Sequence, residues 1–168
     1  MKREETVDYN IKSIWHGISR MYNQYGVEYD VTASTGFVLL NIDAEEGTPA
    51  TKIAPQLGME SRSLTRMLKS MEEKGWVCRK QDPTDGRSVR IFLTDIGREK
   101  RELSRRAVKG FNEKIKSLIS EEQLQNFFTV AKMINEIVDD PKLFDKIAEQ
   151  IAHEYATKGM LDNHHIEN

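Results

Sequence analysis

The sequence predicts a mostly α-helical protein that contains one short β-hairpin. Apolar residues recur at steps of three and four along most of the chain, which is the period of an amphipathic helix. In two short runs near residues 76–94 the rhythm changes to strict alternation, which is the period of a strand. A length of 168 residues suits one domain of ordinary size. We therefore expect a single domain over residues 1–168.

Two helices are expected in the first part of the chain. The first runs from about Glu5 to Tyr25, and Gly26 is a natural stop. Thr32 can cap a second helix that runs toward Glu46 and ends at Gly47. Each of these helices has an apolar face that can pack against the rest of the domain.

A short third helix and a longer fourth helix follow. Thr48 is a candidate N-cap, Pro49 fits the first helical position, and Pro55 should shorten or distort the helix. The fourth helix covers residues 61–75 and has an apolar stripe that we expect in the core, formed by Leu64, Met67, Leu68 and Met71. The side chains that point elsewhere include Arg62, Thr65, Arg66 and Lys69. This helix thus has a core face and a cationic face.

The hairpin spans residues 77–94, with the sequence VCRKQDPTDGRSVRIFLT, and Trp76 should pack at its base. A hairpin tip needs turn residues such as Asp, Pro and Gly, but it does not need the cations that surround this one: Arg79, Lys80, Arg87 and Arg90. Cations in such a position suit the phosphate groups of DNA, and an arginine at the tip can enter the minor groove of DNA. We expect Arg87 to be that arginine and Asp85 to orient it or to brace the turn.

Helices are also expected over the rest of the chain. Thr94 can cap a helix that runs toward Ser117, and a capping box at Ser120–Gln123 begins another that ends near Asp139. Asp140 and Pro141 suit the start of a last helix, which should end at Gly159 and leave a frayed tail over residues 160–168.

Charge and composition limit the function classes. The net charge is −2, yet residues 61–106 hold 13 Lys and Arg against 7 Asp and Glu, a local charge of +6. Such a local excess can steer a protein to phosphate groups. Cys78 is the single cysteine, so no intrachain disulfide can form; we expect it to pack as a small apolar residue, with a redox sensor as the alternative. The chain shows neither a signal-peptide core nor a membrane-spanning run, so we expect a cytoplasmic protein.

Residues 48–97 resemble the winged helix-turn-helix of MarR-type bacterial transcription regulators. The matching features are the Leu57–Gly58 turn, the SLTR segment at Ser63–Arg66 and the EEKG segment at Glu72–Gly75. The run DPTDGR leading into LTDIG completes the match. These features occur together and in register, which makes the signal specific, and a looser resemblance extends to the terminal helices.

The resemblance implies a mostly α fold with a winged helix-turn-helix lobe over residues 32–97 and a two-stranded wing. Helices in residues 1–31 and 98–159 would form the dimerisation region. The resemblance also implies a sequence-specific regulator of the repressor type that binds a palindromic double-stranded operator as a homodimer. The expected DNA-binding residues are Arg62, Ser63, Thr65, Arg66, Lys69, Arg79, Lys80, Asp85, Arg87 and Arg90.

The resemblance further implies a small aromatic or phenolic effector that binds where the dimer helices meet the winged lobe. The residues expected to line that cleft are Trp15, His16, Tyr22 and Phe37, although simple packing of the first helix on the second explains each of them equally well. No motif indicates an enzyme, a cofactor or a metal site. The alternative function is a winged helix that docks an acidic protein partner and does not bind DNA.

Overall fold

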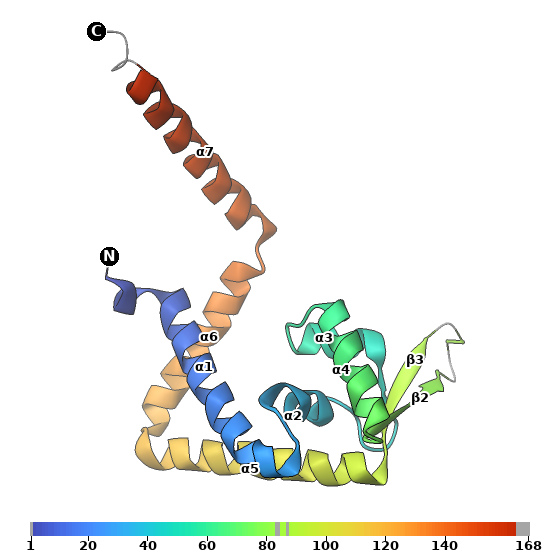
Figure 1. Ribbon diagram of the computed structural model, residues 1–168. Helices are drawn as coiled ribbons and strands as arrows, with labels where there is room; N and C mark the ends of the chain where they lie inside the picture. The colour runs from blue at the N-terminus through green and yellow to red at the C-terminus, as the bar shows by residue number, and fades with distance from the viewer. Residues whose placement is uncertain (1, 83–84, 87, 164–168) are drawn as a thin grey trace. The chain divides into compact units, whose positions relative to one another are not determined.

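The computed structural model describes residues 2–82, 85–86 and 88–163, with side chains in the last helix described up to residue 157 (Figure 1). The chain divides into two compact units, Met1–Glu113 and Lys114–Asn168. The helices are α1 (Val7–Gly26), α2 (Ala33–Leu40), α3 (Ala50–Gln56), α4 (Ser61–Glu73), α5 (Asp95–Leu118), α6 (Glu121–Val138) and α7 (Pro141–Asn163), with short 3-10 turns η1 (Arg3–Glu5) and η2 (Val27–Tyr29). The strands are β1 (Thr48–Pro49), β2 (Val77–Gln81) and β3 (Val89–Leu93), which form an antiparallel sheet in the order β1-β3-β2.

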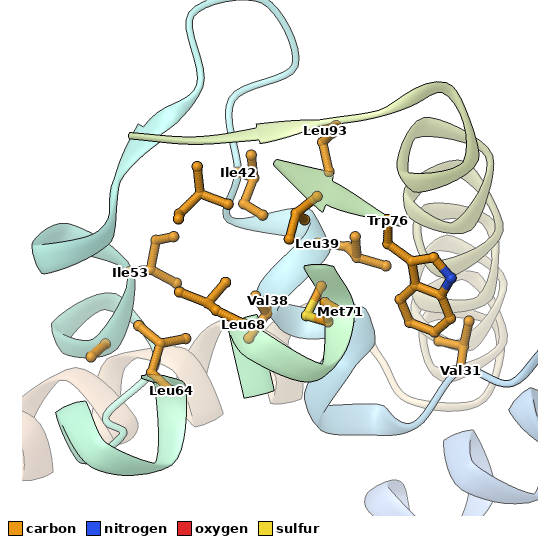
Figure 2. Packing of buried hydrophobic residues seen from close by; sticks show 13 residues of the cluster. Val31, Val38, Leu39, Ile42, Ile53, Leu64, Leu68, Met71, Trp76 and Leu93 are labelled. Atoms are coloured by element: carbon orange, nitrogen blue, oxygen red, sulfur yellow. The ribbon is translucent and has the colours of Figure 1, made fainter. Parts of the chain in front are cut away.

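The core of the first unit lies among α2, α3, α4 and the sheet. Buried apolar side chains from these elements form one cluster, which Figure 2 shows with Leu64 toward one end and Trp76 toward the other. The predicted stripe of α4 belongs to this core: Leu64, Leu68 and Met71 are buried, and Met67 packs against them. Because one face of α4 is held in the core, the opposite face is left for solvent or a partner.

The segment after α2 differs from the prediction. The helix that was expected to reach Glu46 ends at Leu40. The Asp43 carboxylate accepts hydrogen bonds from the backbone N–H groups of Glu46 and Glu45, at 2.8 and 2.9 Å. An Asp side chain that bonds the backbone in this way offers an alternative to the helix. The same two bonds lower the pKa of Asp43 from its ordinary value.

Thr48 and Pro49 form strand β1 rather than the start of a helix, so the sheet has a third strand. The Thr48 hydroxyl accepts a hydrogen bond from the backbone N–H of Asp43 at 2.8 Å and therefore does not cap α3. A proline is tolerated here because β1 is at the edge of the sheet. Pro55 lies inside α3, which is 7 residues long, so the prediction of a short third helix is confirmed.

The hairpin begins immediately after α4 and is fastened at both ends. Gly75 has a left-handed φ of 70°, which allows the chain to turn, and Trp76 is buried at the base of the hairpin as predicted. At the other end, the Thr94 hydroxyl donates to the Gly75 carbonyl at 2.6 Å and accepts from the N–H of Gly97 at 3.1 Å. Thr94 therefore caps α5, as predicted, and also ties this helix to the end of α4.

The second unit contains the end of α5 together with α6 and α7. The predicted capping box is present at the start of α6, where the Ser120 hydroxyl accepts from the N–H of Gln123 at 3.2 Å. Helix α7 continues to Asn163, beyond the predicted end at Gly159, and residues 164–168 lie outside the described residues. No helix in the described part of the chain is long and apolar enough to span a membrane.

Candidate nucleic-acid interface

A tight turn places α4 against α3. Gly58, in the predicted Leu57–Gly58 turn, has a left-handed φ of 59°. The N–H of Met59 then donates to the carbonyl of Ala54 at 3.0 Å, which closes the end of α3. The two helices are thus joined as a helix-turn-helix pair, and α4 is the second helix of the pair.

The outer face of α4 collects the predicted site residues of this helix. All of them are exposed: Arg62, Ser63, Thr65, Arg66 and Lys69. Within the described residues, neither Arg62 nor Arg66 forms an ion pair. Lys69 lies 3.9 Å from the Glu73 carboxylate, but both side chains are well exposed, so this pair contributes little. The cations of this face are therefore directed at solvent.

Two further predicted cations lie on β2 beside this helix. Arg79 donates from Nε to the Glu72 carboxylate at 3.0 Å, which ties the strand to α4. The Nζ atom of Lys80 lies 4.9 Å from the centre of the Phe92 ring on β3. Both residues remain exposed. Arg79 is thus braced against α4, whereas Lys80 rests against an aromatic ring of the wing.

Arg90 differs from the other predicted cations because it is turned into the protein. Its side chain is 22% exposed, and its Nε donates to the Asp82 carboxylate at 2.6 Å. Asp85 is exposed, and its N–H donates to the same carboxylate at 3.2 Å. These contacts brace the wing. Arg87, the arginine predicted to enter the minor groove, lies outside the described residues.

The first unit also contains an apolar cavity of about 390 Å³. Of the predicted ligand-binding residues, Tyr22 and Phe37 line it, with ring centres 6.0 Å apart. The Trp15 ring lies tilted against Phe37, with ring centres 5.7 Å apart, and does not line the cavity. His16 is exposed and does not line it either. Partial burial raises the pKa of Tyr22. Two of the four predicted residues therefore line this cavity.

Sequence reasoning missed the part of the lining that α5 contributes. Phe111 lies 5.9 Å from the Tyr22 ring, and the buried Ser104 faces Gly36 of α2. A Cβ added at Gly36 would lie 3.1 Å from the Ser104 hydroxyl, so α2 and α5 approach closely at this point. The small residue in α2 was the available signal, but nothing in the sequence said which distant segment it would meet.

The described residues contain no group of three or more His, Cys, Asp and Glu side chains that could hold a metal ion. Cys78 is a free, half-buried thiol on β2, paired across the sheet with Phe92. The packing role expected for Cys78 as a small apolar residue stays a prediction.

Comparisons with known proteins agree with this geometry. The sequence model of the MarR family matches residues 31–89. The HTH-type transcriptional regulator SarZ of Staphylococcus aureus (strain USA300) is 35% identical over 97 residues, which is 57% of this chain and 66% of that protein. SarZ of Staphylococcus saprophyticus is 32% identical over 115 residues, which is 66% of this chain and 79% of that protein.

Among solved structures, the S. aureus MepR–DNA complex has a TM-score of 0.71 at 23% identity, covering 78% of this chain and 98% of that one. This likeness supports the fold, and the two SarZ relatives are similar to the chain in sequence as well. Together with the helix-turn-helix, the wing and the cationic face of α4, they establish that the chain belongs to the MarR family of winged helix-turn-helix transcriptional regulators.

Proposed function

We propose that this protein regulates transcription as a homodimer that binds a palindromic operator through α4 and the wing, and that it acts as a repressor in the bacterial cytoplasm. The observation that carries the proposal is the two-faced character of α4. Its apolar face is buried in the core, and its outer face presents three cations, Arg62, Arg66 and Lys69.

The geometry suits the major groove of DNA. That groove admits one α-helix, whose exposed polar side chains meet base edges while neighbouring cations meet phosphates. Arg66 is central on the outer face of α4 and can form two hydrogen bonds with a guanine. Arg79 and Lys80, on the adjacent strand, are placed to contact phosphates. The proposal therefore assigns base reading to α4 and backbone positioning to the start of the wing.

The apolar surface of the terminal helices supports a homodimer. Large apolar side chains that are about half exposed or more occur on α1, α6 and α7; they include Val7, Ile11, Ile14, Trp15, Phe127, Phe128, Met133, Ile137, Phe144, Ile151 and Tyr155. Large exposed apolar surface marks interaction sites in soluble proteins, and each of these helices carries such side chains. A two-fold dimer places its recognition helices about one DNA turn, roughly 34 Å, apart. We assign α7 to an extension of the dimer interface.

The cavity in the first unit supports regulation by a small molecule. Its lining is largely apolar and includes the rings of Tyr22, Phe37 and Phe111. It lies against α2 and α5, and α5 follows the wing directly, so an occupant can favour one position of the lobe over another. A ligand shifts DNA affinity only by as much as it prefers one of two conformations. We assign this cavity to a small aromatic or phenolic effector.

The experiment is a binding titration of the full chain with the intergenic DNA upstream of its own gene and with duplexes selected from a randomised library. Scrambled duplex of equal length serves as competitor. Arg66→Ala should weaken specific binding by about 1 to 3 kcal/mol. Lys132→Ala, which removes an exposed cation from α6, should leave binding unchanged and serves as the matched control.

A second arm of the titration tests the cavity. Phenol, used as a probe, should weaken the complex of the wild-type protein with its selected duplex. Ala107→Phe should reduce that effect, because the larger side chain occupies part of the cavity that Ala107 lines. If the folded, dimeric protein prefers no duplex and binds none, the regulator proposal fails, and an acidic protein partner becomes the better assignment.

A further inference from the structure

A buried carboxylate lies at the base of the wing. The Asp82 side chain is 5% exposed and directly follows β2. Its backbone N–H donates to the Ser88 carbonyl at 2.9 Å, across the two arms of the hairpin. Its carboxylate accepts from the N–H of Asp85 at 3.2 Å. A charge held in this way is costly unless a partner of opposite charge accompanies it.

Arg90 is that partner, and it extends the contact beyond the hairpin. Its Nε donates to the Asp82 carboxylate at 2.6 Å, while its Nη1 donates to the carbonyls of Glu46 and Gly47 at 3.0 and 3.3 Å. One guanidinium therefore joins the wing to the segment that precedes β1. The planar fork of arginine suits such a set of acceptors, and a lysine would not supply it.

The segment that Arg90 holds is packed tightly against the sheet. Gly47 has a left-handed φ of 66°, and a Cβ added there would lie 2.8 Å from both the Ile91 carbonyl oxygen and the Phe92 ring. The next residues form β1, which pairs with β3 and leads directly into α3. A displacement of the wing base is thus opposed by the same backbone that begins the helix-turn-helix.

We propose that Asp82 and Arg90 form a positioning pair, which fixes the wing relative to the helix-turn-helix, and that Arg90 acts through Asp82 rather than by binding DNA itself. The proposal rests on the assignment of the wing and α4 to DNA. It removes Arg90 from the expected DNA contacts and adds Asp82, an acidic residue, to the residues on which DNA binding depends. The affinity of the wing for DNA is then set partly by an ion pair that does not touch the DNA.

The direction in which one substitution changes DNA affinity distinguishes the two roles of Arg90. If Arg90 bound phosphate, Asp82→Asn would remove a carboxylate that competes with phosphate for its guanidinium and lies near the DNA, and this would strengthen binding. If Arg90 positions the wing, the same substitution loosens the wing and weakens binding. We expect about tenfold weaker binding to the duplex that the wild-type protein selects from a randomised library, or about 1.4 kcal/mol.

Three further variants complete the test. Arg90→Met should weaken binding at least as much, because it also removes the hydrogen bonds to the Glu46 and Gly47 carbonyls. The double variant should bind no more weakly than Arg90→Met, because each single variant already removes the ion pair. Glu45→Gln is the matched control: it also removes one negative charge, but from a side chain that is 85% exposed, and it should not weaken binding. If Arg90→Met does not fold, Asp82→Asn still decides the sign, since Asn has nearly the same shape as Asp.

Hydrogen exchange of the free protein separates this proposal from the function on which it rests. Without DNA present, the backbone N–H groups of Asp82 and Asp85 should exchange faster in Asp82→Asn than in the wild-type protein. This result does not depend on whether the protein binds DNA. Equal exchange rates, or unchanged or tighter DNA binding by Asp82→Asn, would overturn the positioning role. Failure of the wild-type protein to select any duplex would instead overturn the proposed function.

Discussion

Gly97 allows α5 to approach the base of the hairpin more closely than any other residue would permit. It lies in the first turn of α5, and a Cβ built on it would be 1.9 Å from the Trp76 carbonyl oxygen. Real Cβ atoms essentially never come within 3.0 Å of such a neighbour. In Gly97→Ala the helix and the Trp76 backbone must therefore move apart by about 1.1 Å, the difference between these two distances.

Two opposing effects set the size of the change. Alanine is the better helix former, by about 1 kcal/mol. Against this, overpacking costs typically about 1 to 3 kcal/mol, and the separation strains the Thr94 hydrogen bonds to Gly75 and Gly97, each worth about 1 kcal/mol. The clash wins because a backbone carbonyl cannot rotate away as a side chain can. We expect the free energy of unfolding of Gly97→Ala to be lower than that of the wild type by about 2 to 3 kcal/mol.

Thermal unfolding followed by circular dichroism measures this loss. For a chain of this size the melting temperature should fall by roughly 4 to 12 °C. Gly110→Ala is the matched control, because Gly110 lies in the same helix and a Cβ there meets nothing within 4 Å. It should raise stability by about 0.5 to 1 kcal/mol. A Gly97→Ala protein as stable as the wild type, beside a stabilised Gly110→Ala, would refute the reasoning.

Two further predictions concern pH and assembly. Hydrogen bonds from Arg105 and Arg106 lower the pKa of Glu102 from 4.5 to about 2. A carboxyl with a depressed folded pKa stabilises the protein above its unfolded pKa and loses that contribution as the pH falls through the folded pKa. In urea titrations, the stability lost by Glu102→Gln should therefore be largest at neutral pH and shrink from about pH 4.5 to about pH 2; a loss independent of pH would contradict this. A chain truncated after Asp139 should dissociate to monomers at higher concentration than the full chain, because it lacks the apolar face of α7. Sedimentation equilibrium measures both dissociation constants, and equal values would show that α7 is not part of the dimer interface.

The elements that local chemistry specifies could be predicted from the sequence. The capping box at Ser120 uses groups three residues apart, and the Thr94 cap acts within the first turn of its helix. The stripe of α4 depends only on the helical period, so its core face and its cationic face were both predicted. The family resemblance had the same basis, since its motifs are the turns, caps and cations of adjacent elements.

Features that depend on distant partners could not be predicted in the same way. Thr48 is a residue type that often caps a helix, but in the fold it pairs with β3, because pairing with a distant strand outweighs a weak local preference for capping. After α2, the Asp43 carboxylate bonds the backbone N–H groups of Glu45 and Glu46, an arrangement that competes closely with continuing the helix. The cavity joins Tyr22 to Phe111, and no local pattern specifies that contact.

The helices, the hairpin and the sign of the charge beside them could be predicted, because they follow from periodicity and from groups a few residues apart. Which cations are available to a partner depended on the fold. Arg66 and Arg90 look equivalent in the sequence, yet one is exposed on α4 and the other is held by Asp82 and two backbone carbonyls. An ion pair or a hydrogen bond requires its groups to lie close in space, and Glu46 and Gly47 come close to Arg90 only in the folded chain.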